Sequence, residues 1–332
     1  MILVLNSGSQ SIKWKVFEPE TFKEKARGDI KVKNKTEFRK KTKKELRKIR
    51  KEYNILKVGH RVVHGGDQRD PAKITWKIKR KIKKAEKYAP LHNPYNLLGI
   101  KTAQSIFKKI PQTAVFDTGF FKDLPIESQT YALPKKIASK YKRMGFHGIS
   151  HQYLAETAAK KISKPLSEIN LITCHLGGGS SITAIKKGKP IDTSMGFTPL
   201  EGLTMMTRPG NIDPGIMLEL IKEYTPKTLE KMLNEQSGLK ALTGEDRMLN
   251  ILKKNTKQAK TGLNIFCYNI KKYIGAYQAI LNKTDAIVFS GKIGYGSKKI
   301  RSMITKDLPI DKKTKILSIK TNEELIIAKI IK

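Results

Sequence analysis

The chain has 332 residues, which corresponds to about two domains of ordinary size and is long enough to bury a substantial core. Hydrophobic residues make up 39% and there are 24 glycines, an ordinary globular composition that excludes collagen-like, mucin-like and wholly disordered chains. The 2 cysteines are too few for a disulfide framework, which favours a reducing compartment. The first residues do not resemble a signal peptide, and no run of about 20 apolar residues could span a bilayer. The composition therefore predicts a cytoplasmic protein that enters no membrane.

The charge is strongly positive, because 67 basic residues face 29 acidic ones, which gives a net charge of +38. The excess is uneven, with 26 basic and 8 acidic residues between Lys23 and Lys87. Such a field attracts nucleic acid through counterion release. However, 56 of the basic residues are lysine and only 11 are arginine, whereas surfaces that read bases favour arginine. We therefore interpret the charge as a solvated surface that attracts anionic substrates, and we do not expect a nucleic acid partner.

Strand-like and helix-like patterns alternate along the chain, which predicts an α/β protein. Strands are expected at 2–5, 12–17, 58–63, 113–116, 170–175, 181–185, 286–290 and 315–319. Helices are expected at 36–53, 96–109, 148–161, 254–281 and 323–332, the third of them with Ser150 in the capping position. One strand–turn–strand unit lies at the start of the chain and another near residue 175, so the fold is expected to consist of two similar halves.

The turns of these two units are rich in small and hydroxyl side chains, at Asn6–Lys13 and at Gly177–Ser181. Backbone N–H groups in a tight turn can bind an anion, so both turns are candidate phosphate sites. Each turn alone is also a common type of hairpin with no binding role. The sequence contains no G-x-x-x-x-G-K-[ST] phosphate loop and no G-x-G-x-x-G, C-x-x-C or H-E-x-x-H motif.

All six histidines lie between residues 60 and 175, in blocks that also contain Gly, Arg or Asn. His60 and His64 have the spacing of metal ligands on a helix, but the two valines between them favour a strand. No Cys or carboxylate completes a zinc set at this position, so we expect local hydrogen bonds there instead of a metal. Arginine is rare in this chain, which makes Arg61 and Arg208, both beside Gly-rich sequence, candidate oxyanion clamps.

Several short blocks of the sequence are rich in polar residues and glycine, which the pattern of strands and helices does not explain. In the first half they are Leu5-Asn-Ser-Gly-Ser9, Gly59-His-Arg-Val-Val-His-Gly-Gly66, Ala89-Pro-Leu-His-Asn-Pro94, Val115-Phe-Asp-Thr118, Gly145-Phe-His-Gly148 and Ser150-His151. In the second half they are His175-Leu-Gly177, Asp192-Thr-Ser-Met-Gly-Phe-Thr-Pro-Leu-Glu-Gly202, Thr207-Arg208, Asp213-Pro214, Lys271-Lys-Tyr-Ile-Gly-Ala-Tyr277, Asp285-Ala-Ile-Val-Phe289 and Thr321-Asn-Glu-Glu-Leu325. In this order the blocks resemble those of the acetate kinase family, and the block at 192–202 is highly specific.

The resemblance implies the fold of the acetate and sugar kinase, heat-shock and actin superfamily, with two similar α/β, ribonuclease H-like lobes and a cleft between them. The expected N-terminal lobe is 1–118 with a returning C-terminal helix at 324–332, and the nucleotide-binding lobe is 119–323. The family forms homodimers. Its activity is that of a phosphotransferase with a carboxyl acceptor, which converts ATP and acetate reversibly to ADP and acetyl phosphate. The implied cofactor is Mg²⁺, for which Mn²⁺ substitutes.

The resemblance also implies roles for particular residues. Arg61 and Arg208 clamp the carboxylate and the transferring phosphoryl group, His147 hydrogen-bonds that group, and Asp117 helps to organise the magnesium. The metal-associated positions are Asn6 and Glu323. The residues that bind the acid and its methyl group are Arg61, Val63, Leu91, Phe146 and Pro199.

The implied nucleotide-binding residues are Ser9, Ser11, Lys13, His175, Leu176, Gly177, Gly178, Gly179, Asp246, Arg247, Gly291, Lys292, Ile293 and Gly294. This chain departs from the family at three of these places. Gly178 stands where Asn is usual, the Asp-x-Arg segment is reduced to Asp246-Arg247, and Lys292-Ile-Gly-Tyr-Gly296 replaces Gly-Ile-Gly-Glu-Asn. The chain is also shorter than typical members, with apparent deletions near residue 245 and after Arg301. Three alternatives follow: a related kinase for propionate, an acetate kinase with another donor such as pyrophosphate, and a polyanion-binding protein of the same fold.

Overall fold

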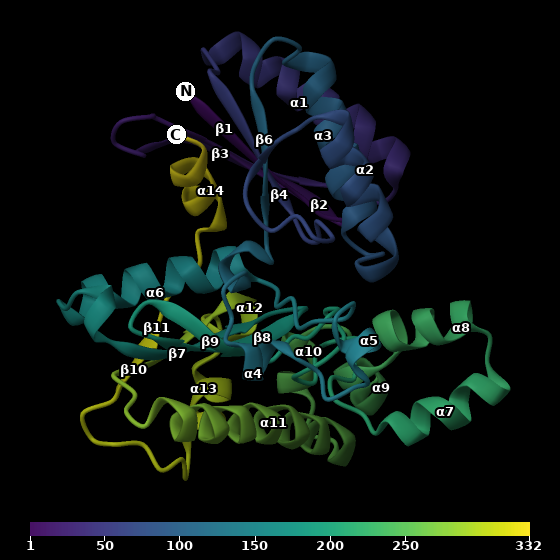
Figure 1. Cartoon of the computed structure of the whole chain (residues 1–332), viewed down its shortest axis with the longest axis vertical. Helices are drawn as coiled ribbons and strands as arrows, with labels where there is room; N and C mark the ends of the chain where they lie inside the picture. Colours follow the sequence, from purple (N-terminus) through teal and green to yellow (C-terminus); the bar gives the residue numbers. More distant parts are fainter. The chain divides into compact units, whose positions relative to one another are not determined.

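A β-hairpin at the start of the chain begins the first of two sheets in the computed structural model, which describes residues 1–332 (Figure 1). The chain divides into two units. Unit 1 contains Met1–Lys122, His147–Tyr153 and Asn322–Lys332, and unit 2 contains Asp123–Phe146 and Leu154–Thr321. Unit 1 takes in the segment from His147 because Ile149 packs in its core and the Gly148 amide donates to the Asp117 carbonyl at 2.9 Å.

The sheet of unit 1 has the strand order β3-β2-β1-β4-β6-β5. Strands β1, β2 and β3 pair antiparallel, and β4 and β6 continue the sheet parallel to β1. The strands are β1 (Ile2–Ser7), β2 (Ser11–Phe17), β3 (Glu24–Lys31), β4 (Lys57–Val62), β5 (Ala72–Lys73) and β6 (Gln112–Phe116). The carboxyl ends of β1, β4 and β6 therefore lie at one edge of the sheet.

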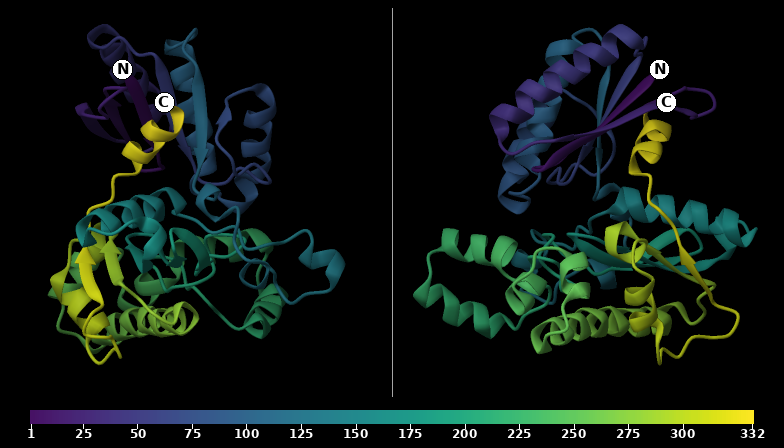
Figure 2. Two further views of the ribbon diagram at one scale, coloured as in Figure 1. Left: turned by 60° about the vertical axis from the view of Figure 1, so that its left-hand side comes forward. Right: turned by 180° about the vertical axis from the view of Figure 1, so that it is seen from behind.

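Helices cover both faces of this sheet (Figure 2). On one face Leu3 and Leu5 pack against α1 (Lys35–Glu52) and α3 (Asn93–Ile106), and on the other Ile2 and Val4 pack against α14 (Glu323–Ile331). This alternation is the period of a strand buried on both faces. A side chain at Gly59 would collide with Ile327, so this glycine permits α14 to lie directly on β4. Helix α2 (Trp76–Lys84) buries Ile78 and Ile82 near β6.

The sheet of unit 2 repeats this arrangement, with the order β11-β10-β7-β8-β9. Three antiparallel strands are again followed by two strands parallel to the first, which confirms two similar α/β halves. The strands are β7 (Asn170–Leu176), β8 (Ser180–Lys186), β9 (Lys189–Thr193), β10 (Ala286–Ser290) and β11 (Lys315–Ser318).

The long helix α11 (Lys257–Leu281) packs on this second sheet together with α13 (Lys298–Thr305). Their side chains Phe266, Ile270 and Ile300 share one core with Ile172 and Phe289 of β7 and β10. The remaining helices of four or more residues are α4 (Ile126–Gln129), α5 (Lys135–Ala138), α6 (Gly148–Ile162), α7 (Pro214–Glu223), α8 (Pro226–Lys231), the π-helix Met232–Gln236, α9 (Gly238–Thr243), α10 (Met248–Lys253), α12 (Gly291–Gly294) and, in unit 1, the 3₁₀ helix Ala85–Tyr88.

Every strand and long helix expected from the sequence is present, with some ends shifted: α3, for example, spans Asn93–Ile106 where 96–109 was expected. Two other differences at helix starts have identifiable reasons. Ser150 is the third residue of α6 and not its cap, because the bond from Gly148 to Asp117 sets the start of the helix. Helix α11 begins at Lys257 because the Thr256 side chain accepts from the Ala259 amide and caps it there. No helix has both the length and the apolar character needed to cross a membrane.

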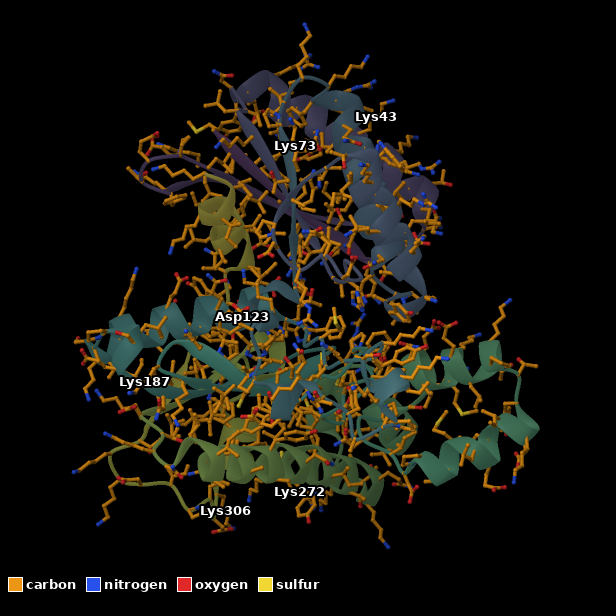
Figure 3. The ribbon with its side chains drawn as sticks, viewed as in Figure 1. Lys43, Lys73, Asp123, Lys187, Lys272 and Lys306 are labelled. Atoms are coloured by element: carbon orange, nitrogen blue, oxygen red, sulfur yellow. The ribbon has the colours of Figure 1, made fainter.

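The excess positive charge lies on the surface of each unit. Helix α1 buries Phe38, Leu46 and Ile49, and its lysines occupy the opposite face. Lys43 points outward from this helix, and Lys272 points outward from α11 (Figure 3). A lysine in such a position stays hydrated, so the charge costs the fold little beyond mutual repulsion.

His60 is a buried histidine in β4 whose Nε2 is hydrogen-bonded to Gln112 Oε1 at 2.9 Å. Burial lowers the pKa of His60 from 6.5 to about 4, so the folded chain keeps a neutral ring while the unfolded chain binds a proton below pH 6.5. The titration of His60 therefore leaves the unfolding free energy unchanged above pH 6.5 and lowers it progressively as the pH falls towards 4. Between pH 7 and 4.5 we expect the wild type to lose about 2–3 kcal/mol more unfolding free energy than His60→Gln.

This difference can be measured by urea titration followed by tryptophan fluorescence, because Trp14 and Trp76 both lie in unit 1. The general acid sensitivity of a chain with this charge affects both proteins equally. Equal losses in the two proteins would show that His60 does not carry this dependence.

Candidate active site

Polar side chains gather where β1, β4 and β6 end. Arg61 lies near the end of β4, and Asp117 directly follows β6. The Arg61 guanidinium binds Asp117 through two bonds, from Nε to Oδ1 at 2.9 Å and from Nη2 to Oδ2 at 2.6 Å. Its Nη1 lies 3.1 Å from Glu323 Oε2 and donates to Asn6 Oδ1 at 3.3 Å. The carboxyl ends of parallel strands are the usual place for a ligand site in α/β folds, which makes this cluster a candidate site.

The start of α14 completes the cluster. Asn6 Nδ2 donates to Glu323 Oε2 and to Glu324 Oε1, both at 3.1 Å. Asp117, Glu323 and Glu324 are all buried, so three carboxylates surround one guanidinium. Burial opposes the charge on Arg61, but the Asp117 and Glu323 carboxylates outweigh it and hold the pKa of Arg61 above its ordinary value. Burial raises the pKa of Asp117, and with three carboxyl groups around one guanidinium the cluster has oxygen ligands for a further cation.

The donor set of this cluster suits a magnesium ion. Carboxylate and amide oxygens are the ligands that Mg²⁺ takes, and it is commonly held by one or two of them together with waters and phosphates. No group of three or more His, Cys, Asp or Glu side chains forms a ready metal cage in the chain. The predicted ligands Asn6 and Glu323 are brought together here, and they fit an ion that is bound only partly by protein.

Three further predicted residues lie in unit 1. His147 has a left-handed backbone with a φ of 58°, an uncommon conformation for a residue with a side chain. Because the next residue, Gly148, is bonded to the Asp117 carbonyl, this backbone lies beside the acidic cluster. Val63 is buried and follows β4, where its amide donates to Asn96 Oδ1 at 3.0 Å, and Leu91 is half-buried before α3.

Arg208 is the most unusual side chain of unit 2. It is 6% exposed, its Nη1 donates to the Pro199 carbonyl at 2.7 Å, and its Nε has no hydrogen-bond partner. It forms no ion pair, and burial lowers its pKa from 12.5 to about 10. A buried charge is normally paired, because an unpaired one is costly. The predicted oxyanion clamp is therefore a buried cation that lacks a partner of its own chain.

The backbone around Arg208 is tightly fixed. The Met205 amide donates to the Arg208 carbonyl at 3.0 Å, and the Leu239 amide donates to the Met205 carbonyl at 2.9 Å. Gly238 has a φ of 65°, and a side chain there would overlap the backbone of Met205 and Arg208. The arginine thus emerges from a rigid turn, which suits a group that must meet an anion at one place.

The predicted phosphate hairpin of unit 2 is the turn between β7 and β8. Gly177, Gly178 and Gly179 form this turn, and a side chain at Gly178 would meet nothing within 4 Å. Helix α12 lies against it, because Gly291, with a φ of 78°, packs on the Leu176 backbone. His175 and Leu176 end β7, and Ile293 and Gly294 lie on α12, so the structure brings these predicted residues together.

Other predicted nucleotide residues are more exposed. Lys292 lies on α12 with its side chain in solvent, so it does not crowd the interior of unit 2. Asp246 and Arg247 are exposed between α9 and α10. In unit 1, Ser9, Ser11 and Lys13 lie on the β1–β2 hairpin, where the Gly8 amide donates to the Ser11 carbonyl at 2.9 Å.

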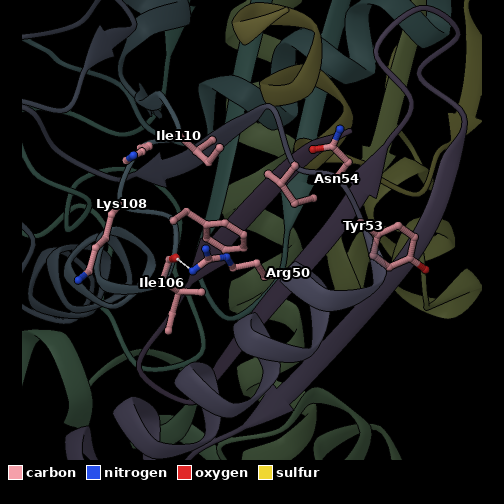
Figure 4. A pocket seen from close by; sticks show the side chains of 9 residues that line it. Arg50, Tyr53, Asn54, Ile106, Lys108 and Ile110 are labelled. Carbon is pink, nitrogen blue, oxygen red and sulfur yellow. Dashed lines mark hydrogen bonds between the residues drawn. The ribbon is translucent and has the colours of Figure 1, made fainter.

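A separate pocket of about 350 Å³ lies in unit 1, where the chain enters β4 and β6 (Figure 4). Arg50 lines it and donates to the Ile106 carbonyl at 2.7 Å. None of the predicted site residues lines this pocket, and the strands that start beside it carry Arg61 and Asp117 at their other ends. This pocket is therefore separate from the place where the Arg61 and Asp117 side chains meet.

Sequence reasoning missed four residues that the structure adds to these sites. Glu324 follows the predicted Glu323 and accepts a hydrogen bond from the same Asn6 amide. The sequence alone does not indicate which of two adjacent glutamates faces inward. In unit 2, Tyr131, Arg143 and Glu201 form a half-buried polar cluster. Only Glu201 belonged to a block that the sequence marked as specific, and its partners lie more than 50 residues away.

Comparisons with known proteins identify the family of this chain. The model of the acetokinase family matches residues 40–311. Curated relatives include acetate kinases from Halothermothrix orenii, 38% identical with 99% of this chain and 98% of the relative covered, and from Helicobacter pylori strain Shi470, 41% identical with 98% and 97% covered.

Solved structures show the same fold. A propionate kinase from Francisella tularensis superposes with a TM-score of 0.89 at 35% identity, over 99% of this chain and 98% of that one. Porphyromonas gingivalis acetate kinase gives a TM-score of 0.85 at 29% identity, over 100% and 99% of the two chains. A family match over most of the chain and relatives covered nearly end to end lead to one conclusion: this chain belongs to the acetokinase family.

Proposed function

We propose that the chain catalyses the reversible transfer of a phosphoryl group from ATP to acetate, which yields acetyl phosphate and ADP. The observation that carries this proposal is Arg208, a buried guanidinium with an unsatisfied Nε and no carboxylate partner. A fixed cation of this kind stabilises an anion whose charge develops or moves during the reaction. Membership of the acetokinase family supports a carboxylate and a phosphoryl group as the anions that this cation meets.

The chemistry needs no general base. A carboxylic acid has a pKa near 4 and is already ionised at neutral pH, so the nucleophile is ready to attack. The obstacle is repulsion between the carboxylate and the phosphates, and phosphoryl transfer is catalysed mainly by positioning and charge neutralisation. In this proposal Arg208 and Arg61 supply the positive charge, and His147 donates a hydrogen bond to the transferring group. Asp117 holds Arg61 in one orientation through its two hydrogen bonds.

Asn6 and Glu323 would hold the Mg²⁺ that the family requires, and Mn²⁺ would substitute. When bound, the ion would neutralise part of the charge on the phosphates of ATP. The present cluster already orients these ligands, because Asn6 is hydrogen-bonded to both Glu323 and Glu324. Glu324 would thereby fix the amide that faces the ion.

The test of this function is the formation of acetyl phosphate by the purified chain, trapped as its hydroxamate, with ATP, GTP or pyrophosphate as donor. We expect acetate with ATP to give the largest kcat/KM. The Arg208→Ala variant, purified in the same way, controls for kinases of the expression host. If no donor yields acyl phosphate from acetate, the proposed function is wrong, and a preference for pyrophosphate or propionate would replace it by one of the alternatives.

The acid pocket provides a test of substrate choice. Val63, Leu91, Phe146 and Pro199 are its proposed residues, and one methylene is worth about 1–3 kcal/mol of discrimination in such a pocket. Val63→Ala makes room for a longer acid, so we expect the KM for acetate to rise and the propionate-to-acetate ratio of kcat/KM to increase roughly tenfold. Steady-state kinetics with both acids measures this ratio.

The control for Val63→Ala is Val115→Ala, which removes the same atoms from the core of unit 1 beside α14. That variant should lose stability and keep the wild-type ratio. A ratio unchanged in Val63→Ala would place the acyl pocket elsewhere.

We further propose that two copies of the chain associate through α7. This helix buries none of its residues, and Ile216, Leu218 and Ile221 are 53%, 61% and 56% exposed. Exposed apolar groups of this density mark an interaction surface. The helix carries Glu219 and Glu223 with a single lysine, so it is a place where two strongly basic chains can approach.

We expect light scattering after gel filtration to give twice the chain mass of 37.5 kDa. Leu218→Glu places a charge in the proposed interface and should shift the protein to monomer. Leu249→Glu makes the same change at a leucine that is 71% exposed on α10 and should leave the dimer intact. A wild type that is already monomeric would contradict the assignment.

A further inference from the structure

A cluster of half-buried polar side chains lies in unit 2, and none of its members is among the residues that the sequence assigns to the reaction. Glu201 accepts a hydrogen bond from the Tyr131 hydroxyl through Oε2 and from Arg143 Nη2 through Oε1, the latter at 2.7 Å. The guanidinium of Arg143 also lies over the ring of Tyr131, 5.5 Å from its centre. Each of the three side chains thus contacts the other two.

The cluster connects two segments of unit 2, the first at 131–146 and the second at 193–201. From the first segment, the Tyr131 hydroxyl accepts from the Phe197 amide at 2.8 Å, and Arg143 Nη1 donates to the Thr193 carbonyl at 3.2 Å. The backbone reinforces this, because the amides of Met144 and Gly145 donate to the Gly196 carbonyl at 3.0 and 3.2 Å. The segment that ends at residue 146 is therefore held against the loop at 193–201.

Gly196 lies directly against the Tyr131 and Glu201 side chains. A side chain at this position would overlap both the Glu201 carboxylate and the Tyr131 hydroxyl. The backbone of Gly196 does not have a positive φ, so glycine is needed here for space and not for conformation. The loop can close over the cluster only because this residue has no Cβ.

The two segments carry residues of the proposed site at their ends. The first segment ends in Phe146, and the second contains Pro199, both of them proposed to contact the acid. The Pro199 carbonyl is also the acceptor for Arg208 Nη1 at 2.7 Å, the one hydrogen bond that orients this arginine's side chain within its own unit. Any shift of the loop would move the pocket wall and the guanidinium together.

We propose that Glu201, through Tyr131 and Arg143, is a positioning residue that fixes the Phe197–Pro199 loop and thereby orients Arg208 for the carboxylic acid. This inference rests on the proposed function. Burial, aided by the Glu201 charge, raises the pKa of Tyr131 well above its ordinary value, so the hydroxyl remains a donor at any working pH. Glu201 touches neither reacting group and acts only through the loop.

The experiment uses three variants of the full chain that break the cluster at different places. Tyr131→Phe removes only the hydroxyl, Glu201→Gln keeps the shape of the side chain, and Gly196→Ala forces the carboxylate and hydroxyl apart. In each we expect the KM for acetate to rise about tenfold or more and kcat to fall, while the KM for ATP stays within twofold. In the double variant of Tyr131 and Glu201 the losses should be far from additive, because both changes break one bond.

Matched controls carry the same chemical changes on the surface of unit 2. Tyr268→Phe alters a tyrosine that is 63% exposed, and Glu168→Gln alters an exposed glutamate. Both should behave as the wild type. A general loss of folding would lower the apparent kcat and the melting temperature and would leave both KM values unchanged.

A second readout separates this inference from the proposed function. Inorganic phosphate should raise the melting temperature of the wild type by binding at Arg208, and this rise should be absent in Arg208→Ala and reduced in Tyr131→Phe. If the wild type makes no acyl phosphate, the proposed function fails, and the phosphate shift still tests the positioning role. Wild-type acetate kinetics, or an undiminished phosphate shift in folded Tyr131→Phe and Glu201→Gln, would overturn the inference.

Discussion

Replacing Arg208 with alanine is expected to lower kcat by about 10²–10³-fold, which corresponds to about 3–4 kcal/mol of lost transition-state stabilisation. The reason is the isolation of this side chain. It has no carboxylate partner, and its Nε makes no hydrogen bond, so its charge is directed at an anion that the chain does not supply. Stability should change little or even improve, because the substitution removes an unpaired buried charge.

Steady-state kinetics and urea unfolding of Arg208→Ala together provide the measurement. Arg208→Lys is the conservative comparison, which keeps a charge but loses the planar fork, so it should recover only part of kcat. A folded Arg208→Ala protein with the kcat of the wild type would remove Arg208 from the mechanism.

Replacing Arg61 with alanine should lower kcat by a similar factor and should also destabilise the protein. Arg61 is the counterion of the buried Asp117 and lies 3.1 Å from Glu323, so its loss leaves buried carboxylates without compensation. Breaking a buried ion pair in this way typically costs about 3–5 kcal/mol. The Arg61→Ala and Arg208→Ala proteins are therefore expected to differ in unfolding free energy although their activities are similarly low.

The double variant Arg61→Ala with Asp117→Asn distinguishes the two effects. Removing the orphaned charge should restore much of the unfolding free energy, but the activity should stay low because the clamp is still absent. Recovery of activity along with stability would mean that Arg61 serves only to hold the fold together.

The elements that could be predicted are those with a clear apolar pattern. Strand β10 was predicted to the residue because all five of its side chains are buried and turn residues follow it. Strand β3 was missed because it lies at the edge of its sheet and alternates charged and half-buried residues without an apolar run. Helix α2 was missed because six basic residues mask the two isoleucines that it buries.

The same contrast applies to the sites. Arg61 and Arg208 stood out because arginine is rare in a chain whose basic residues are mostly lysine. The contacts that surround these arginines could not be predicted from the sequence. Asn6 contacts Glu324, which is 318 positions away, and Tyr131 contacts Glu201, which is 70 positions away. Periodicity and local motifs describe neighbours along the chain, whereas these pairs exist only after the sheets have formed.

The position of α14 has a consequence for the order of folding. Unit 2 is made of segments that lie almost wholly within one stretch of the chain, whereas unit 1 needs its first 122 residues and its last helix to meet. Closing so long a loop is slow compared with forming local contacts. Until α14 docks on β1 and β4, the face of β4 at Gly59 is exposed to solvent, and Arg61 has no contact with Glu323. Assembly of the acidic cluster is thus coupled to the docking of α14, so a chain in which this helix is not yet docked would have one uncovered sheet face and no competent cation site.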